Sequence, residues 1–106
     1  LVDVVDEGDK FMVRADIPGF DKENVDIQVT EDSIELSGKA STEKKEEKEK
    51  YKRYERSYSS FSRTIQLPED VKPDQASASL KNGVLEVKLP KVEPTKPEKK
   101  HKVNIE

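Results

Sequence analysis

The sequence has no cysteine, no tryptophan, a single histidine and no long apolar run. Without cysteine, disulfide bonds are excluded, and a reducing compartment is permitted. One histidine, His101 near the C-terminal end, provides too few ligands for a zinc site, so no metal is expected. No apolar stretch is long enough to span a membrane or to form a signal peptide, so no membrane partner is expected either.

Apolar residues are also scarce, because only 31% of the 106 residues are hydrophobic while 41% are charged. This length predicts one domain plus tails, with a thin core. Small domains with thin cores are often stabilised by disulfides, metals or association, and the composition leaves association. The net charge of −3 comes from nearly balanced acids and bases, which favours solubility over nucleic-acid binding.

Catalytic motifs are missing as well. No glycine-rich phosphate loop and no Gly-x-Ser-x-Gly element is present. His101 lies in a tail and cannot be held in the geometry that general base catalysis needs. We therefore expect neither an enzyme nor a cofactor. The lysines and arginines of residues 44–56 alternate with glutamates that cancel their field, which argues against a nucleic-acid partner.

Apolar residues that do occur follow a period of two, which predicts half-buried strands. The residues that share a face within each run are Phe11, Val13, Ala15 and Ile17; Val25, Ile27 and Val29; Ile34 and Leu36; Phe61, Arg63, Ile65 and Leu67; Ala76, Ala78 and Leu80; and Leu85, Val87 and Leu89. The opening residues 1–6 form a weaker pattern and are expected to be an edge strand.

Turn residues separate these runs, and Asn82-Gly83 is the strongest hairpin signal among them. Several short antiparallel strands in about 90 residues predict an all-β, two-sheet sandwich. We assign residues 1–90 to this domain and residues 91–106 to a C-terminal extension. Because the chain opens with Leu1 in strand-like sequence, we expect a preceding N-terminal arm that this sequence does not include.

Residues 39–57 interrupt the pattern with a run of charge that contains Tyr51 and Tyr54. Glutamate–lysine spacings could support a short helix, but no apolar stripe would hold that helix to a core. A solvated surface loop is one interpretation. We prefer a dimerisation loop that reaches to a neighbouring subunit, where the two tyrosines are paired and buried.

The C-terminal extension ends in two branched apolar residues, Val103 and Ile105, which point to the same side of an extended strand. Residues 91–102 before them are charged, contain two prolines and are expected to form an extended spacer. Val103 and Ile105 are either incidental aliphatic residues in a frayed terminus or a binding motif that the spacer carries to another surface.

Ala78, followed by Gly83-Val84-Leu85, resembles the signature of the alpha-crystallin domain, the core of small heat shock proteins. Other elements of that family occur in the same order along the chain. They are Ile17-Pro18-Gly19, the strand with Arg63 that ends at Pro68, the connector Asp70-Val71-Lys72-Pro73, and Val103-Asn104-Ile105. The charged insert matches the microbial and plant branch of the family.

The resemblance implies an immunoglobulin-like sandwich that dimerises by strand exchange. Residues 51–56 would pair with β-strand residues 2–6 of the neighbour, so the expected interface includes Val2, Val4, Tyr51, Tyr54 and Arg63. Arg63 shares its face with apolar residues and would need carboxylate or carbonyl partners. An exposed arginine displaced by a bulge is the alternative.

The resemblance also implies that Val103 and Ile105 dock into a groove between two strands of opposite sheets. We expect the lining to be Ile27, Val29, Ala78 and Leu80, with Ala78 leaving room for an apolar side chain. A spacer of this length, at about 3.1 Å per residue, spans roughly 35 Å. Docking on the same subunit or on another dimer is therefore possible.

By analogy with the family, we expect an ATP-independent chaperone that binds partly unfolded client proteins and assembles with itself into dimers and higher oligomers. We expect a cytoplasmic location. A p23-like co-chaperone adaptor and a purely structural oligomerisation module are the alternatives. A p23-like domain lacks both the charged insert and the Val-x-Ile tail.

Overall fold

A computed structural model describes residues 2–48, 51–94 and 102–106, without the side chains of residues 42–57. The described residues form seven strands and two short 3₁₀ helices. The strands are β1 (Val2–Asp6), β2 (Lys10–Asp16), β3 (Val25–Val29), β4 (Ser33–Lys48), β5 (Tyr51–Gln66), β6 (Ser77–Lys81) and β7 (Val84–Pro90). The 3₁₀ helices are η1 (Lys22–Asn24) and η2 (Pro73–Gln75).

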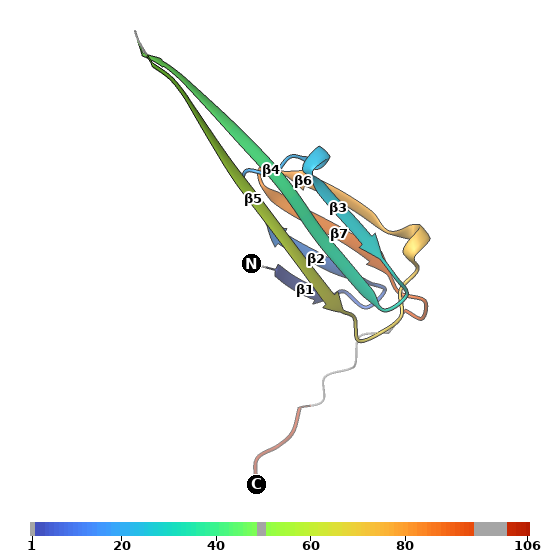
Figure 1. Ribbon diagram of the computed structural model, residues 1–106. Coiled ribbons are helices and arrows are strands. Elements are labelled where there is room, and N and C mark those ends of the chain that lie inside the picture. Colours follow the sequence, from blue (N-terminus) through green and yellow to red (C-terminus); the bar gives the residue numbers. More distant parts are fainter. Residues whose placement is uncertain (1, 49–50, 95–101) are drawn as a thin grey trace.

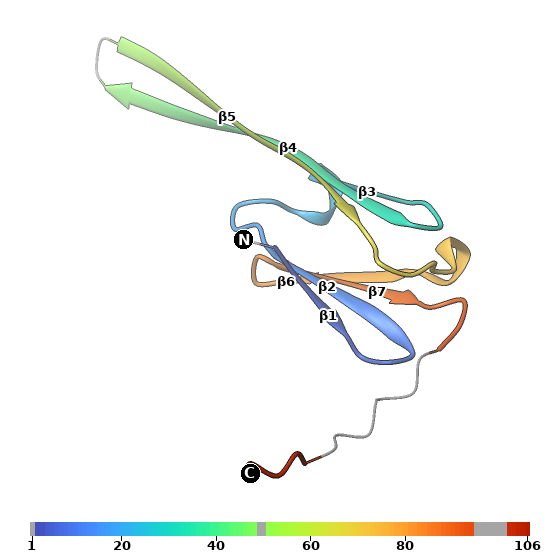
Figure 2. The same cartoon turned by 90° about the horizontal axis from the view of Figure 1, so that it is seen from below.

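The strands form two antiparallel sheets that stack face to face (Figure 2). One sheet has the strand order β1-β2-β7-β6, and the other has the order β3-β4-β5. The predicted two-sheet sandwich is confirmed, and β1 is an edge strand as expected. At the opposite edges lie β6 in the first sheet and β3 in the second, so each sheet has two edges open to a partner.

The core lies between the sheets and is built from the alternating positions that the sequence indicates. On β2 and β7, the register pairs Phe11 with Leu89 and Val13 with Val87, and all four side chains are buried. The rest of the core consists of Ala15, Ile17, Ile34, Leu36, Leu67, Val71 and Leu85. The strands that contribute buried core residues, β2, β4 and β7, each do so from one face, so the period-two prediction identified most of the core correctly.

The Asn82-Gly83 turn joins β6 to β7 as predicted. Both residues have positive φ, 52° for Asn82 and 76° for Gly83, as a two-residue hairpin of this handedness requires. Gly83 has a second constraint, because a Cβ there would lie 3.1 Å from the Cα of Pro18. The backbone N–H of Ile17, the first residue after β2, donates to the carbonyl of Gly83 at 2.7 Å. This hydrogen bond holds the turn against the end of β2.

Residues 39–57 are assigned from the sequence to a charged dimerisation loop. Outside residues 49–50 they continue β4 and β5 as one long hairpin that projects beyond the sandwich (Figure 1), and its role in dimerisation stays a prediction. Across this extension, four pairs of register partners carry opposite charge, which favours strand pairing. They are Glu43 with Arg56, Lys44 with Glu55, Glu46 with Arg53, and Glu47 with Lys52.

Gly38, Phe61 and Phe20 pack together near the point where the hairpin extends beyond the sandwich. Gly38 on β4 pairs with Phe61 on β5, and a Cβ on Gly38 would overlap the Phe61 ring. The Phe61 ring in turn packs edge-to-face on Phe20, with ring centroids 4.9 Å apart. The missing side chain of Gly38 therefore makes the space that lets Phe61 reach Phe20.

Gly38→Ala is expected to lower the free energy of unfolding by about 1–3 kcal/mol, because the methyl group displaces Phe61 from Phe20. Denaturant titration measures the change. Ser37→Ala, on the opposite face, is the control and should change stability by less than about 0.5 kcal/mol. In a Phe61→Ala background the effect of Gly38→Ala should largely disappear; an unchanged effect there would contradict the steric explanation.

Candidate self-assembly surfaces

A pocket of about 220 Å³ lies between β3 and β6, the edge strands of opposite sheets. Ile27 on β3 and Ala78 and Leu80 on β6 line it. These are three of the four residues predicted to form a groove for the tail, and docking there stays a prediction. Its other lining residues are Lys22, Val25, Ser79 and Leu85.

One expected lining residue is not in the pocket. Val29 packs against the core at the far end of β3, where it pairs with buried Ile34. Val25, at the other end of the same strand face, lies in the pocket instead. Alternation places Val25, Ile27 and Val29 on one face, but it cannot tell which end of that face faces β6.

Ala78 is exposed, although it belongs to a run predicted to be a half-buried strand. It pairs with buried Val87 and so lies on the inner face of its sheet. Leu80 on the same face is half-buried, and Leu85 on β7 is fully in the core. The reason is that β6 is an edge strand with no opposing side chain above Ala78, and this uncovered position is what opens the pocket.

Val103 and Ile105 are the two most exposed large apolar side chains among the described residues, at 84% and 98%. Residues 95–101, which form most of the predicted spacer, lie outside the described residues. Docking of the tail therefore stays a prediction.

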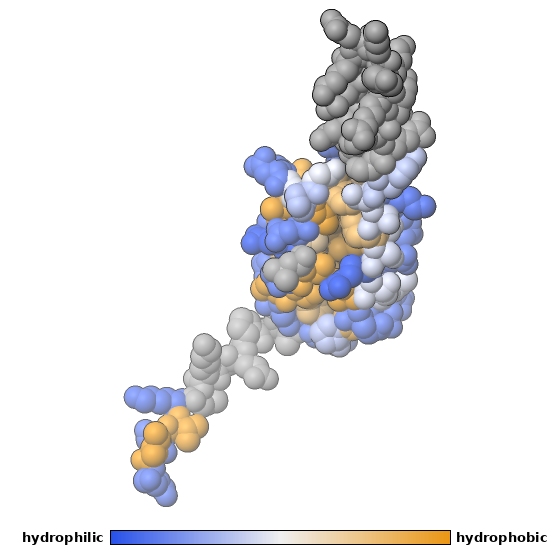
Figure 3. Space-filling view, turned by 60° about the vertical axis from the view of Figure 1, so that its left-hand side comes forward, coloured by the Kyte–Doolittle hydropathy of each residue, from blue (hydrophilic) through white to orange (hydrophobic). Residues whose placement is uncertain are grey.

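The second candidate surface is the side of the sandwich formed by β1 and β5. Neither strand has a neighbour on its outer edge among the described residues. Val2 is half-buried, and Val4 and Val5 are exposed. Figure 3 looks toward this side and shows apolar side chains gathered below the hairpin, with polar side chains around them. The exposed edge of β1 can therefore accept another strand.

Tyr51 and Tyr54, expected to pair with β1 of a neighbour, lie on β5 opposite Lys48 and Lys45 of the same chain. Their side chains lie outside the described part of the structure. Because β5 is an edge strand, pairing with β4 leaves its other edge available. Exchange of this segment onto β1 of a neighbour stays a prediction.

Arg63 pairs with Leu36, whose side chain is completely buried, so both lie on the inner face of their sheet. Arg63 is nevertheless exposed, because β5 is at the sheet edge where the sandwich is open. The pairing runs through this position without a bulge. Among the described residues no ion pair involves Arg63.

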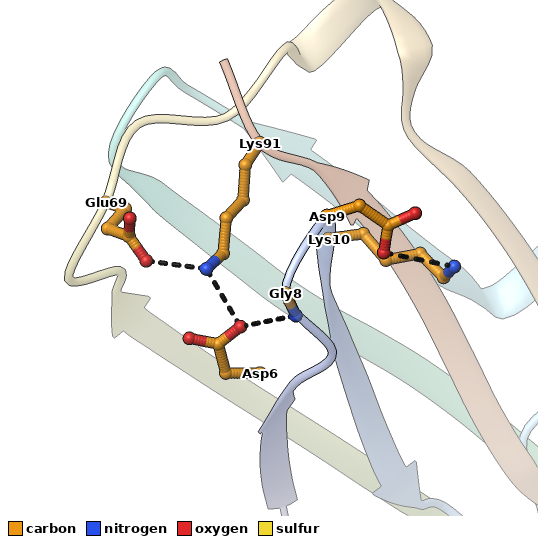
Figure 4. A network of polar contacts seen from close by, with 6 residues as sticks. All are labelled: Asp6, Gly8, Asp9, Lys10, Glu69 and Lys91. Atoms are coloured by element: carbon orange, nitrogen blue, oxygen red, sulfur yellow. Dashed lines mark hydrogen bonds and ion pairs between the residues drawn. The ribbon is translucent and has the colours of Figure 1, made fainter. Parts of the chain in front are cut away.

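Sequence reasoning missed a buried charge at the end of β7. The ammonium of Lys91 is inaccessible to water and contacts carboxylates of Asp6 and Glu69, at 2.8 and 2.6 Å (Figure 4). It also lies 4.7 Å from the centre of the Phe11 ring. Lysine in a charged tail gives no signal of burial, and its partners are far away in the sequence.

The electrostatics of this cluster favour the ionised pair. Burial of Lys91 opposes its charge, but hydrogen bonds to Asp6 and Glu69 outweigh burial and raise the pKa of Lys91. The hydrogen bond from Lys91, aided by the Gly8 backbone N–H at 2.8 Å, lowers the pKa of Asp6. The ammonium and the Asp6 carboxylate therefore both stay charged at neutral pH.

The described residues contain no cluster of histidine, cysteine or carboxylate side chains suited to a metal ion. None of the described helices is long and apolar enough to cross a membrane. What this part of the chain does offer is open strand edges, an apolar pocket and two exposed aliphatic side chains, which together are suited to binding other polypeptides.

Comparison with known proteins agrees with this geometry. Residues 3–106 match the Hsp20/alpha crystallin family. The 17.6 kDa class I heat shock protein 1 of Arabidopsis thaliana is 42% identical over 96 residues, covering 90% of this chain and 62% of that protein. The chain thus spans about three-fifths of the length of such curated relatives.

Solved structures give the same assignment. Heat shock protein 16.0 from Schizosaccharomyces pombe superposes with a TM-score of 0.78 at 35% identity, covering 98% of this chain and 96% of that one. A small heat-shock protein from Xylella fastidiosa gives a TM-score of 0.67 at 33% identity, covering 98% and 95%. This chain therefore belongs to the Hsp20/alpha-crystallin family of small heat shock proteins.

Proposed function

We propose that this protein is an ATP-independent chaperone that binds partly unfolded proteins and prevents their aggregation. The observation that carries the proposal is that one chain presents an unfilled apolar pocket and, separately, two exposed aliphatic side chains suited to fill it. Such surfaces bind extended apolar segments without nucleotide. We place this activity in the cytoplasm, where a cysteine-free protein of balanced charge is at no disadvantage.

In the proposed assembly, Val103 and Ile105 of one subunit occupy the pocket lined by Ile27, Ala78 and Leu80 of another. Burying two aliphatic side chains contributes roughly 1.5–3 kcal/mol each. Ordering the tail offsets part of this, so a single docked tail binds with about millimolar affinity or weaker. Many tails docking together make the assembly stable while each contact stays exchangeable.

The dimer in this proposal uses the other side of the sandwich. Residues 51–56 of one subunit would add to the outer edge of β1 in its partner, which satisfies backbone groups that the isolated edge leaves to water. The same contact would cover Val4 and the inner face of Arg63. Two different surfaces would then build the dimer and join dimers to one another.

Client binding follows from the weakness of tail docking. When a tail leaves, the pocket becomes available to an apolar segment of a partly unfolded protein. Binding to the non-native client lowers its free concentration by mass action and so slows its aggregation. A tail in the pocket competes with clients, which makes Val103-Asn104-Ile105 a reversible block of the client surface.

Light scattering of heated malate dehydrogenase tests the activity. With equimolar or excess chain and no nucleotide, scattering is expected to fall by at least half, and added ATP should change nothing. Bovine serum albumin at equal mass is the control for non-specific protection. Unchanged scattering from a chain that forms oligomers would instead favour the purely structural module, and a monomer without protection would favour the adaptor.

A further inference from the structure

Lys91 lies where three separate segments of the chain meet (Figure 4). Its ammonium binds Asp6, the last residue of β1, and Glu69, in the connection after β5. Its own backbone N–H donates to the carbonyl of Asp9 at 2.9 Å. The next residue, Val92, donates its N–H to the carbonyl of Asp70 at 3.0 Å. Lys91 is therefore both the start of the C-terminal extension and a contact to the edge strand.

Removing only one partner of the Lys91 ion pairs is costly. A buried ammonium is tolerated only when its hydrogen bonds are made to charged partners, and removing one carboxylate leaves part of that charge unbalanced. The side chains of β1 after Val2 are all exposed, so packing does little to hold the strand. Besides its ladder with β2, the Asp6–Lys91 ion pair is what fastens its end.

We propose that Lys91 is a positioning residue that couples the order of edge strand β1 to the order of the first residues of the C-terminal extension. If β1 loosens, Lys91 loses Asp6, and the start of the extension loses one of the contacts that hold it to the domain. If a strand pairs with β1, Asp6 is held in place and the extension is held with it. Coupling of this kind is reciprocal.

The functional role of this coupling rests on the proposed function, because the coupling links the edge of β1 to the C-terminal extension, the two elements that the proposed assembly uses. Strand exchange onto β1 would set the path of the tail toward a neighbouring pocket. Conversely, tension from a docked tail on residues 91–92 would reach β1 through the ion pair. The two contacts would then form and open together rather than independently.

Hydrogen exchange of the full chain, followed by mass spectrometry with peptide resolution, tests the coupling. Asp6→Asn keeps the size of the side chain but removes the charge that faces Lys91. It is expected to speed exchange of the amides of β1 and also of residues 91–92 by about fivefold or more, the lower end of typical coupling between sites. Amides in the middle of β7, residues 85–89, should keep their rates.

Asp3→Asn is the matched control, because Asp3 is an exposed carboxylate on the same strand and has no ion pair in the described structure. It should leave all three regions unchanged. Glu69→Gln approaches the cluster from the other side and should speed exchange in β1 as well as in residues 91–92. Running the series also in the Val103→Gly/Ile105→Gly background removes any contribution from tail docking.

Three results would overturn the proposal: faster exchange of β1 alone after Asp6→Asn, faster exchange of residues 91–92 alone after Glu69→Gln, or an equal increase that includes β7. The last would mean general destabilisation. Because no client is present, a chain that fails to suppress aggregation can still show coupled exchange. Failure of the coupling and failure of the chaperone proposal are thus separate results.

Discussion

Replacing Val103 and Ile105 together with glycine is expected to reduce the assembly to dimers. Both side chains are almost fully exposed, so the change removes no contact within the subunit and should leave its melting temperature unchanged. It removes about 3–6 kcal/mol of gross burial from every docked tail. Because the oligomer depends on many such contacts acting together, the loss is multiplied across subunits. Native mass spectrometry at several protein concentrations measures the outcome.

Two control variants separate the motif from the rest of the extension. Asn104→Gly changes the residue between the two aliphatic side chains, and Val92→Gly removes an exposed aliphatic residue at the start of the extension. Both should leave the oligomer close to its original size. If the double variant keeps that size as well, the tail is not an assembly ligand.

The pocket side of the contact can be tested in the same way. Ala78→Glu places a charge in the pocket and should mimic the tail variant, since a buried carboxylate without a partner opposes docking. Ala78 is exposed, so the fold should tolerate the change. Ser77→Glu introduces the same charge on the neighbouring residue, outside the pocket lining, and serves as its control.

The sandwich itself could be predicted from the sequence because one physical rule decides it. Each strand of the core buries one face, so alternation of apolar and polar residues marks both the strand and its orientation. Phe11, Val13, Leu85, Val87 and Leu89 were all identified in this way and are all buried. The Asn82-Gly83 turn follows equally directly from the need for positive φ.

The charged hairpin could not be predicted by that rule. Residues 43–56 have no alternation of apolar and polar residues, so the pattern that reveals a strand is absent from them. Their strand structure comes instead from backbone pairing and from opposite charges in register, such as Glu43 with Arg56. Those pairings become visible only once the register is known, and that register continues the pairing inside the sandwich, where buried Ile34 faces half-buried Ile65.

The candidate surfaces were also predicted only in part. Ile27, Ala78 and Leu80 were named because the family resemblance pointed to two edge strands, and the structure brings them to one pocket. The exposure of Ala78 and the place of Val29 depend on how the edge strands β3 and β6 lie relative to one another, which no local pattern encodes. The Lys91 cluster depends on three segments meeting in space and was missed for that reason.

Replacing residues 43–56 with a two-residue Asn-Gly turn is expected to convert the dimer to a monomer that still folds. The turn would join Thr42 to Ser57, which are register partners, so the remaining parts of β4 and β5 keep their pairing. The core residues that the structure describes all lie outside the deleted segment. What is removed is the segment proposed to pair with β1 of the neighbour, and with it the contact that covers Val4.

Light scattering coupled to size exclusion measures the mass, and thermal melting measures the fold. The melting temperature of the shortened chain should be compared with that of the original chain at the lowest concentration at which it is soluble, because dimerisation itself raises the melting temperature. The Val103→Gly/Ile105→Gly variant is the matched comparison, since it should lose the oligomer and keep the dimer.

A shortened chain that remains a dimer would show that subunits pair without the hairpin, and the surface formed by β1 and Arg63 would then need another partner. A monomer with a cooperative melt would instead assign dimerisation to the hairpin and higher assembly to the tail, two surfaces on opposite edges of one sandwich.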